Sequence, residues 1–274
     1  MVKNILSIDV EEIFHAEYVK KGAERKNYRS LVNIELILEI LKVYDISATF
    51  FVVGEIIDKF PKILKIIEEQ GHEVSFHGWS HKPLWELNEE SFSYEVEKFL
   101  RIHPNCLGFR APSFSLDERT LWALNILENR GFIYDSSLFP TKTPLYGVPK
   151  VPLVPYKLSK KNLTKENDQG IWEFPPLTYS FFGIRIPSAG GFYLRFIPAL
   201  VRKSMKSRNL RGYPAIIYVH SWELDPETPR FPLGLFRSFI TYHNIGKTTK
   251  FLNDLLSHFE FTSFKNYLAD HESN

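Results

Sequence analysis

The feature that most constrains the fold is a regular alternation between two kinds of segment along the chain. Segments rich in β-branched and aromatic residues alternate with segments in which apolar residues recur every three or four positions, a pattern typical of parallel strands joined by crossover helices. We expect strands at residues 3–10, 47–53, 73–77, 107–110, 132–135, 170–174, 215–220 and 259–264. We expect helices at residues 34–44, 55–70, 88–102 and 118–130, with Ser30 or Asn33 as the first cap, and a last helix beginning near residue 248. The sequence therefore predicts an α/β fold.

The alternation fades between residues 140 and 176, where prolines are spaced through a polar and basic stretch. A linker between two domains would end one pattern and begin another. Here strand-like segments of the same kind resume after the stretch. We therefore predict one domain, residues 1–274, that contains an irregular excursion at about residues 140–176.

Charge balance and cysteine content exclude several classes of protein. The chain has 34 Lys and Arg against 32 Asp and Glu, a net charge of +2, and no basic run of the kind that binds nucleic acid. Its single cysteine, Cys106, excludes an intrachain disulfide and a cysteine-based zinc site. Asp9 interrupts the first apolar stretch before it reaches signal-peptide length, and no uncharged run approaches the roughly 18 residues of a membrane span. We expect a cytoplasmic protein without a nucleic-acid partner or a transmembrane segment, whose oligomeric state the sequence leaves open.

Polar side chains gather where the predicted strands end, which is the edge that carries the active site in parallel α/β folds. The first strand runs into Asp9, Val10, Glu11 and Glu12. Because successive side chains of a strand point to opposite sides, Asp9 and Glu11 would share one side. A solvated acidic turn is the alternative interpretation of this segment.

Two histidines, His77 and His81, follow the third predicted strand. If the chain turns helical there, a separation of four residues brings both imidazoles to one side, within reach of one metal ion. Together with the two carboxylates of the first strand they form the set that metal-assisted hydrolysis needs. A pair of histidines without a metal is the alternative.

Arg110 and His220 also stand at the ends of predicted strands. A guanidinium in this position can hold a carboxylate in one orientation and keep it ionised, although a surface salt bridge would explain the residue equally. His220 is either a proton donor or a structural hydrogen-bond partner.

These motifs resemble the carbohydrate esterase family 4, or NodB-homology, polysaccharide deacetylases, and the likeness covers most of the chain. The family's motifs are matched by residues 7–11, 77–81, 110–112 and 218–220. Residues 188–193 and 218–226 are similar to the branch associated with exosortase and exopolysaccharide gene clusters. The resemblance implies a distorted (β/α) barrel of about seven parallel strands and a divalent metal, most often zinc. It makes Asp9 the general base, His77 and His81 metal ligands, Arg110 the residue that orients Asp9, and His220 the general acid.

The sequence departs from the family's first motif, because Val10 stands where most members have an aspartate ligand. We predict Glu11 as the third ligand, with Glu12 as the second choice and metal-independent chemistry as the third. Asp135 lies near the family's fourth motif and is expected to tune His220.

The resulting hypothesis is a hydrolase of carbon–nitrogen bonds other than peptide bonds, which removes N-acetyl groups from the amino sugars of a polysaccharide or its precursor. The N–H of Phe114 would stabilise the oxyanion. Phe114, Tyr193 and Trp222, beside a flexible Gly190–Gly191 pair, would bind the sugar. A cyclic-amide hydrolase resembling allantoinase and a non-catalytic glycan-binding protein are the alternatives.

Overall fold

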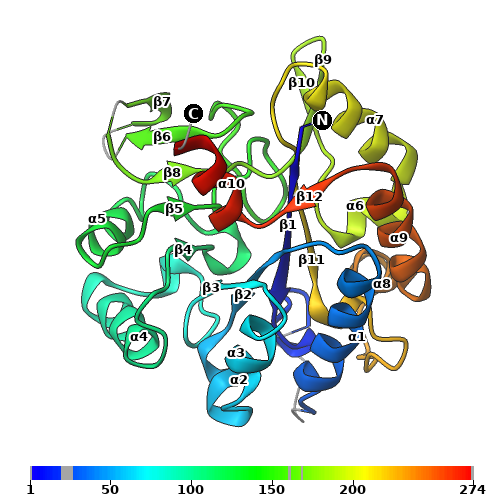
Figure 1. The fold of residues 1–274 in the computed structure, drawn as a ribbon, viewed down its shortest axis with the longest axis horizontal. Helices are drawn as coiled ribbons and strands as arrows, with labels where there is room; N and C mark the ends of the chain where they lie inside the picture. Colours follow the sequence, from blue (N-terminus) through cyan, green and yellow to red (C-terminus); the bar gives the residue numbers. More distant parts are fainter. Residues whose placement is uncertain (1, 20–26, 160–161, 168, 273–274) are drawn as a thin grey trace.

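The computed structural model of this chain describes residues 2–19, 27–159, 162–167 and 169–272, and its centre is a mostly parallel sheet (Figure 1). Within the described residues, seven strands form one row of parallel pairs, in the order β11, β1, β2, β3, β4, β5, β8. Their bounds are β11 (Ile216–His220), β1 (Asn4–Val10), β2 (Thr49–Val52), β3 (Glu73–Phe76), β4 (Gly108–Phe109), β5 (Tyr134–Asp135) and β8 (Trp172–Glu173). The α/β class and the mostly parallel central sheet predicted from the sequence are confirmed.

The two ends of this row of parallel strands approach each other. The N–H of Leu177, just beyond β8, donates to the carbonyl of Ile216 in β11 at 2.9 Å. A short strand, β12 (Phe261–Thr262), pairs with the first residues of β1. The sheet therefore curves round on itself, as a distorted barrel requires.

The excursion contains more regular structure than the sequence pattern suggested. β6 (Tyr156–Ser159) pairs antiparallel with both β8 and β7 (Asn162–Glu166), while residues 160, 161 and 168 lie outside the described part of the chain. After β8, β9 (Thr178–Phe181) and β10 (Ile184–Pro187) form a separate hairpin. These strands are short, so their alternation of buried and exposed residues is too brief to separate from loop sequence.

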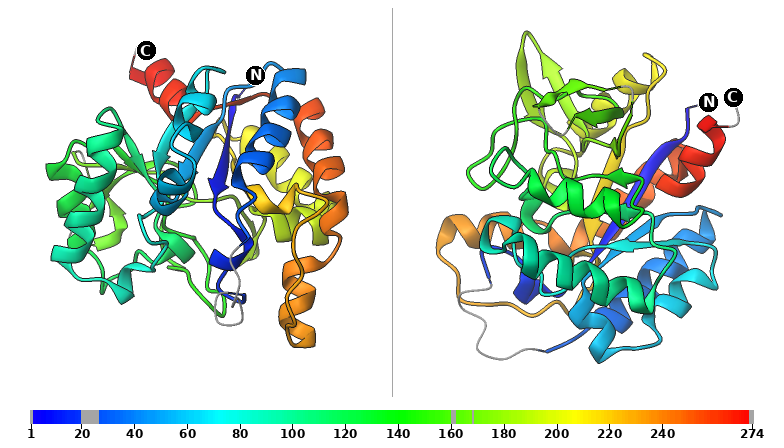
Figure 2. Two further views of the ribbon diagram at one scale, coloured as in Figure 1. Left: turned by 90° about the horizontal axis from the view of Figure 1, so that it is seen from below. Right: turned by 90° about the vertical axis from the view of Figure 1, so that its left-hand side faces the viewer.

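Helices pack around the outside of the sheet, except the last, whose Phe264 and Leu268 pack with Ile5 and Phe51 on the other side of the strands (Figures 1 and 2). They are α1 (Ser30–Val43), α2 (Gly54–Lys59), α3 (Ile63–Glu68), α4 (Glu89–Ile102), α5 (Trp122–Asn129), α6 (Gly191–Phe196), α7 (Pro198–Asn209), α8 (Leu235–Tyr242), α9 (Thr248–His258) and α10 (Phe264–Glu272). Within the described residues, none of them combines the length and the apolar character needed to cross a bilayer.

Three helical predictions need correction. The helix expected at residues 55–70 is two helices, α2 and α3, because Pro61 between them has no N–H to donate and its ring disfavours a helical residue before it. Neither Ser30 nor Asn33 caps the first helix, since the helix begins at Ser30 itself. The chain also continues beyond its last strand into α10, a helix that the sequence pattern did not predict.

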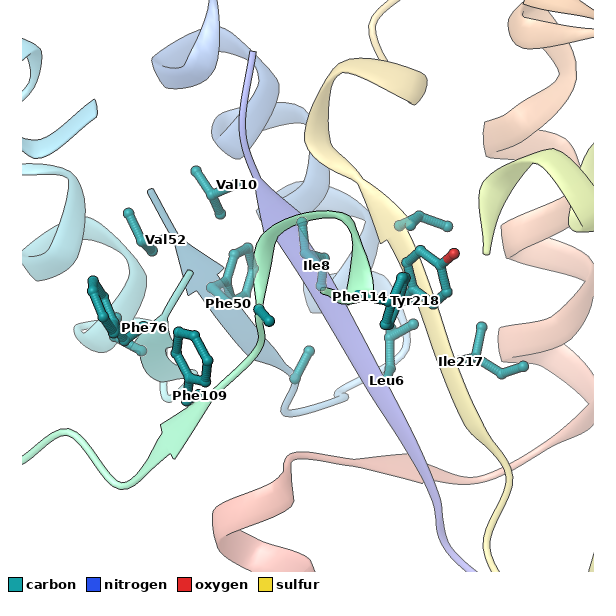
Figure 3. Close-up of a cluster of buried hydrophobic side chains, with 14 of the residues drawn as sticks. Leu6, Ile8, Val10, Phe50, Val52, Phe76, Phe109, Phe114, Ile217 and Tyr218 are labelled. Atoms are coloured by element: carbon teal, nitrogen blue, oxygen red, sulfur yellow. The ribbon is translucent and has the colours of Figure 1, made fainter. Parts of the chain in front are cut away.

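Strand β1 positions the site because its two sides face different surroundings. Leu6, Ile8 and Val10 pack in the main apolar cluster with Phe50 and Phe76 (Figure 3). Between them, Ser7 and Asp9 are buried on the other side of the strand. The carboxyl end of β1 therefore presents an acid toward the interior of the curved sheet.

Candidate active site

The two carboxylates of the first motif reach the same point. Asp9 lies in register with His220 of β11, and both Asp9 and Glu11 are almost fully buried. Oδ2 of Asp9 and Oε2 of Glu11 each lie 3.9 Å from Nε2 of His77. The period-two prediction that placed these acids on one side is confirmed.

His77 and His81 also converge, although they do not lie on a helix. The segment that joins them is a loop in which Gly78 (φ +73°) and His81 (φ +52°) have left-handed backbone conformations. The ring centroids lie 5.0 Å apart. Nδ1 of His77 donates to the carbonyl of Arg110 at 2.7 Å, and burial lowers the pKa of His77 to about 4. Its other nitrogen, Nε2, therefore carries no proton, and its lone pair is available to a metal ion.

Glu11, His77 and His81 have the arrangement of a metal site. Their ligand atoms lie within 4.8 Å of one another, and all three residues are buried. Nε2 of His81 lies 2.6 Å from Oε2 of Glu11, yet this buried nitrogen makes no hydrogen bond of good geometry. Burial alone would raise the pKa of Glu11, but the surrounding histidines lower it far below its usual range. Two imidazole nitrogens and an ionised carboxylate that aim at one point fit a divalent metal.

Glu12, the second choice for the third metal ligand, has a different role. Its Oε1 accepts hydrogen bonds from the N–H groups of Arg29 and Ser30, at 2.8 and 2.7 Å, and from the hydroxyl of Ser30 at 2.6 Å. These donors lie at the start of α1, where backbone N–H groups have no partner within the helix. Glu12 therefore caps α1 from a distant part of the chain, and this explains why neither Ser30 nor Asn33 is needed as a cap.

Arg110 is fully buried and fixes Asp9. Its Nη1 donates to Oδ1 of Asp9 at 2.6 Å and to the hydroxyl of Ser7 at 2.9 Å, while Nε and Nη2 donate to Ser136. One oxygen of Asp9 is thus held by the guanidinium, and the other faces the histidines. This is the geometry expected for a residue that orients Asp9.

Asp135 does not lie where a partner of His220 would. Its carboxylate accepts from the hydroxyl and the N–H of Ser137, at 2.6 and 3.0 Å, and it is paired with the buried carboxyl of Glu173. Burial and the neighbouring Asp135 raise the pKa of Glu173 well above its ordinary value, so Glu173 keeps its proton and shares it with Asp135. Ser137 in turn accepts from the N–H of Ala111 at 2.8 Å. This pair therefore supports the loop that carries Arg110, and the prediction that Asp135 tunes His220 is not supported.

The partner of His220 is Glu223. Oε2 of Glu223 lies 3.1 Å from Nδ1 of His220 and accepts from its backbone N–H at 2.9 Å, while Oε1 accepts from Nη2 of Arg195 at 2.7 Å. Nε2 of His220 is left facing the site, 3.8 Å from Oε1 of Glu11. Burial alone would lower the pKa of His220, but Glu11 and Glu223 outweigh it and raise the pKa to about 9. His220 therefore carries a proton at neutral pH.

Sequence reasoning missed Glu223 and Arg195. The available signal was the position of Glu223 three residues after His220, which lets a carboxylate reach back to the imidazole. The Gly190–Gly191 pair, expected to be flexible, instead permits close packing. A Cβ on Gly191 would lie 1.9 Å from Oε2 of Glu223, and Gly190 has φ +91°.

A cavity of about 330 Å³ opens beside these groups, and all three predicted sugar-binding residues, Phe114, Tyr193 and Trp222, line it. Trp222 is nearly buried, stacks on His220, and donates from Nε1 to Oε1 of Glu11 at 3.0 Å, so its main contacts position the site. The N–H of Phe114 is occupied, because it donates to the carbonyl of Ala111 at 3.0 Å. The prediction that this N–H binds the oxyanion is therefore wrong.

Ser113, on the same loop as Phe114, offers an alternative donor. It lines the cavity and has a left-handed backbone (φ +54°). In the part of the chain that the structure describes, its N–H donates to no acceptor. It is therefore a candidate to hold a developing negative charge.

Two family models match this chain. Residues 31–131 match a family described as polysaccharide deacetylase, and residues 136–269 match a domain of unknown function, DUF3473. The first model ends after α5, and the second includes the segments that supply His220, Glu223 and Arg195.

Curated relatives match over shorter stretches. A peptidoglycan deacetylase-like protein of Gibberella zeae is 26% identical over 53% of this chain, and a peptidoglycan-N-acetylglucosamine deacetylase of Bacillus cereus is 38% identical over 28% of it. The chain spans 46% and 28% of the lengths of these two relatives.

Solved structures share the fold over nearly the whole chain. A candidate polysaccharide deacetylase from Mycobacterium smegmatis superposes with a TM-score of 0.59 at 18% identity, covering 98% of this chain and 89% of the other. An allantoinase superposes with a TM-score of 0.57 at 15% identity, covering 95% and 86%. At these identities the likeness concerns the fold.

Proposed function

We propose that this chain, whose membership of the polysaccharide deacetylase family is supported by the family model and by the curated relatives, hydrolyses N-acetyl groups on the amino sugars of a polysaccharide or its precursor. The observation that carries the proposal is the convergence of Glu11, His77 and His81 beside a free oxygen of Asp9 and the proton-bearing Nε2 of His220. The bond broken is the amide C–N bond, and the products are acetate and a free amine.

Each residue of the cluster has a defined task in this reaction. A divalent metal held by Glu11, His77 and His81 would supply a Lewis acid and make water acidic enough to react near neutral pH. Oδ2 of Asp9 takes the proton of the attacking water, because Arg110 holds the other oxygen and leaves Oδ2 facing the histidines.

The other side of the cluster handles the departing amine. Nε2 of His220 donates its proton to the amide nitrogen as the C–N bond breaks, while Nδ1 stays bonded to Glu223. The N–H of Ser113 is available to the carbonyl oxygen as negative charge develops on it. Without a proton from His220, the amine would be a poor leaving group.

Several finer points belong to the same proposal. Two imidazoles and one carboxylate suit zinc, which we propose as the metal. The segments at residues 188–193 and 218–226 support a place in the branch associated with exosortase and exopolysaccharide clusters. The cytoplasmic location stays a prediction of the sequence.

The test combines metal analysis with acetate release from N-acetylated oligosaccharides. His77→Ala and His81→Ala are expected to lose the metal and the activity together. Asp9→Asn is expected to keep the metal and lose turnover by orders of magnitude. His258→Ala, an exposed histidine of α9, is the matched control and should change neither.

The outcomes separate the alternatives. Stoichiometric metal in both histidine variants would remove the proposed site, and full acetate release by Asp9→Asn would reassign the base. Hydrolysis of cyclic amides without acetate release would favour the allantoinase-like alternative. Sugar binding without any hydrolysis would favour a non-catalytic protein.

A further inference from the structure

A cluster of apolar side chains, most of them exposed, lies beside the cavity. We call it the α6–α8 patch, and it consists of Phe192, Phe196, Leu235, Phe236 and Phe239. Leu235 is 93% exposed, Phe236 64%, Phe196 48% and Phe239 42%. The ring of Phe192 stacks on Phe196 at 5.4 Å and meets Phe239 at 6.1 Å, so α6 and α8 present one surface. Figure 2 shows α8, in orange, projecting from the body of the molecule.

The patch is continuous with the active site. Phe192, Phe236 and Phe239 line the same cavity as Asp9 and His220. An apolar surface therefore extends from the reacting groups to the outside of the protein. Every residue of the patch lies within residues 136–269, the stretch matched by the domain of unknown function, and outside the deacetylase match.

The chain segment that carries α8 is cationic. Residues 228–250, which include α8, contain Arg230, Arg237, Lys247 and Lys250 and no acidic residue. Arg237 directly follows Phe236 on α8. Such a segment attracts an anionic group and opposes contact with the same segment of a second copy of this chain.

We propose that the α6–α8 patch binds the hydrocarbon chain of an amphiphilic substrate, an N-acetylated amino sugar joined through phosphate to a long alkyl or prenyl chain. This inference rests on the proposed function. Leucine and phenylalanine side chains offer no hydrogen bonds to a hydroxyl-rich polymer, and Leu235, the most exposed residue of the patch, has no ring on which a sugar can stack. A hydrocarbon chain buries this surface, and the neighbouring cations attract the phosphate.

The first experiment compares two phosphodiesters of N-acetylglucosamine 1-phosphate, one with a dodecyl and one with a methyl group, below the concentration at which the dodecyl compound aggregates. Calorimetry measures Kd for each, and acetate release measures kcat/KM. A fully buried methylene contributes up to about fourfold in affinity, so partial burial of the chain should make the dodecyl compound bind at least about tenfold more tightly. Equal Kd values for the two compounds would overturn the proposal.

The second experiment locates the effect on the protein. Leu235→Ser and Phe236→Ser should reduce the dodecyl-to-methyl ratio of affinities several-fold. Phe182→Ser is the matched control, because Phe182 is 90% exposed on the β9–β10 hairpin and does not line the cavity. An unchanged ratio in the α8 variants, or an equal fall in the control, would overturn the proposal.

Further measurements separate other occupants and other failures. A membrane would be the occupant if the protein bound sugar-free phosphatidylglycerol vesicles, Leu235→Ser abolished that binding, and the dodecyl compound bound no more tightly than the methyl compound. A dimer that Leu235→Ser dissociates would make a second copy the occupant. Acetate release without a dodecyl preference overturns this inference and leaves the proposed function intact. A dodecyl preference in Kd without acetate release supports this inference and overturns the proposed function.

Discussion

Replacing Trp222 by phenylalanine tests whether Glu11 must be held in place to bind a metal. The substitution removes the indole N–H that donates to Oε1 of Glu11 at 3.0 Å. It keeps an aromatic ring in the position that stacks on His220. The change therefore acts mainly on the orientation of the proposed carboxylate ligand.

The size of the effect follows from burial. Trp222 is 4% exposed and Glu11 3%, so water cannot easily replace the lost donor. A hydrogen bond to a charged group is worth about 1.5–3 kcal/mol, which corresponds to a loss of metal affinity of roughly tenfold to somewhat over a hundredfold. Changes in groups that orient metal ligands commonly cost about 10–100-fold.

The assay is competition for zinc against a chelator of known affinity, at a pH near 7. Trp85→Phe is the control, because Trp85 is partly exposed on a surface turn. Thermal unfolding of the metal-free variants checks that the fold is retained. Zinc affinity within twofold of the parent protein in Trp222→Phe would refute the claim that this hydrogen bond positions Glu11.

Three further predictions concern stability. Burial raises the pKa of Glu173 above its unfolded value, so the stability that this residue contributes is complete at low pH and is lost as pH rises through the folded pKa. Relative to Glu173→Gln, which does not titrate, the parent protein should lose up to about 1.4 kcal/mol of unfolding free energy per pH unit in urea unfolding. A difference in unfolding free energy between the two proteins that stays constant from pH 5 to 9 would contradict this. Gly191→Ala forces a methyl group against the buried carboxylate of Glu223 and should lower the free energy of unfolding by about 3 kcal/mol or more. The control is Gly234→Ala, where the added methyl group meets open space and the free energy of unfolding should change by no more than about 0.5 kcal/mol. Equal denaturation midpoints for the two variants would argue against tight packing at Gly191. Glu12→Ala should lower the free energy of unfolding by about 1–2 kcal/mol through loss of the α1 cap and should keep the metal, whereas Glu11→Ala should lose the metal. Loss of metal in Glu12→Ala would make Glu12 a candidate ligand again.

Local pattern was sufficient for the parts of the site that belong to strands. The alternation along β1 placed Asp9 and Glu11 on one side and Val10 in the core, and the structure agrees. The parallel arrangement brought the strand ends that carry Arg110 and His220 to the same edge. Both results depend on periodicity, which a sequence records directly.

Pattern failed where a residue's role depends on a distant partner or on a loop. The loop geometry that joins His77 and His81 rests on left-handed residues, which a spacing of four cannot reveal. Glu12 and Glu11 are adjacent acids, and one caps α1 while the other meets the histidines. Asp135 was expected near His220 and instead pairs with Glu173.

The sequence by itself determined the class of fold, the edge at which the polar residues gather, and the residue types available there. Only the tertiary structure decided which of those residues touch, that Glu223 with Arg195 serves His220, and that apolar side chains of α6 and α8 surround the cavity. Strand periodicity is a local property. Most of these contacts join residues tens of positions or more apart, as Arg195 and Glu223 are, and they exist because the folded sheet brings its loops to one end.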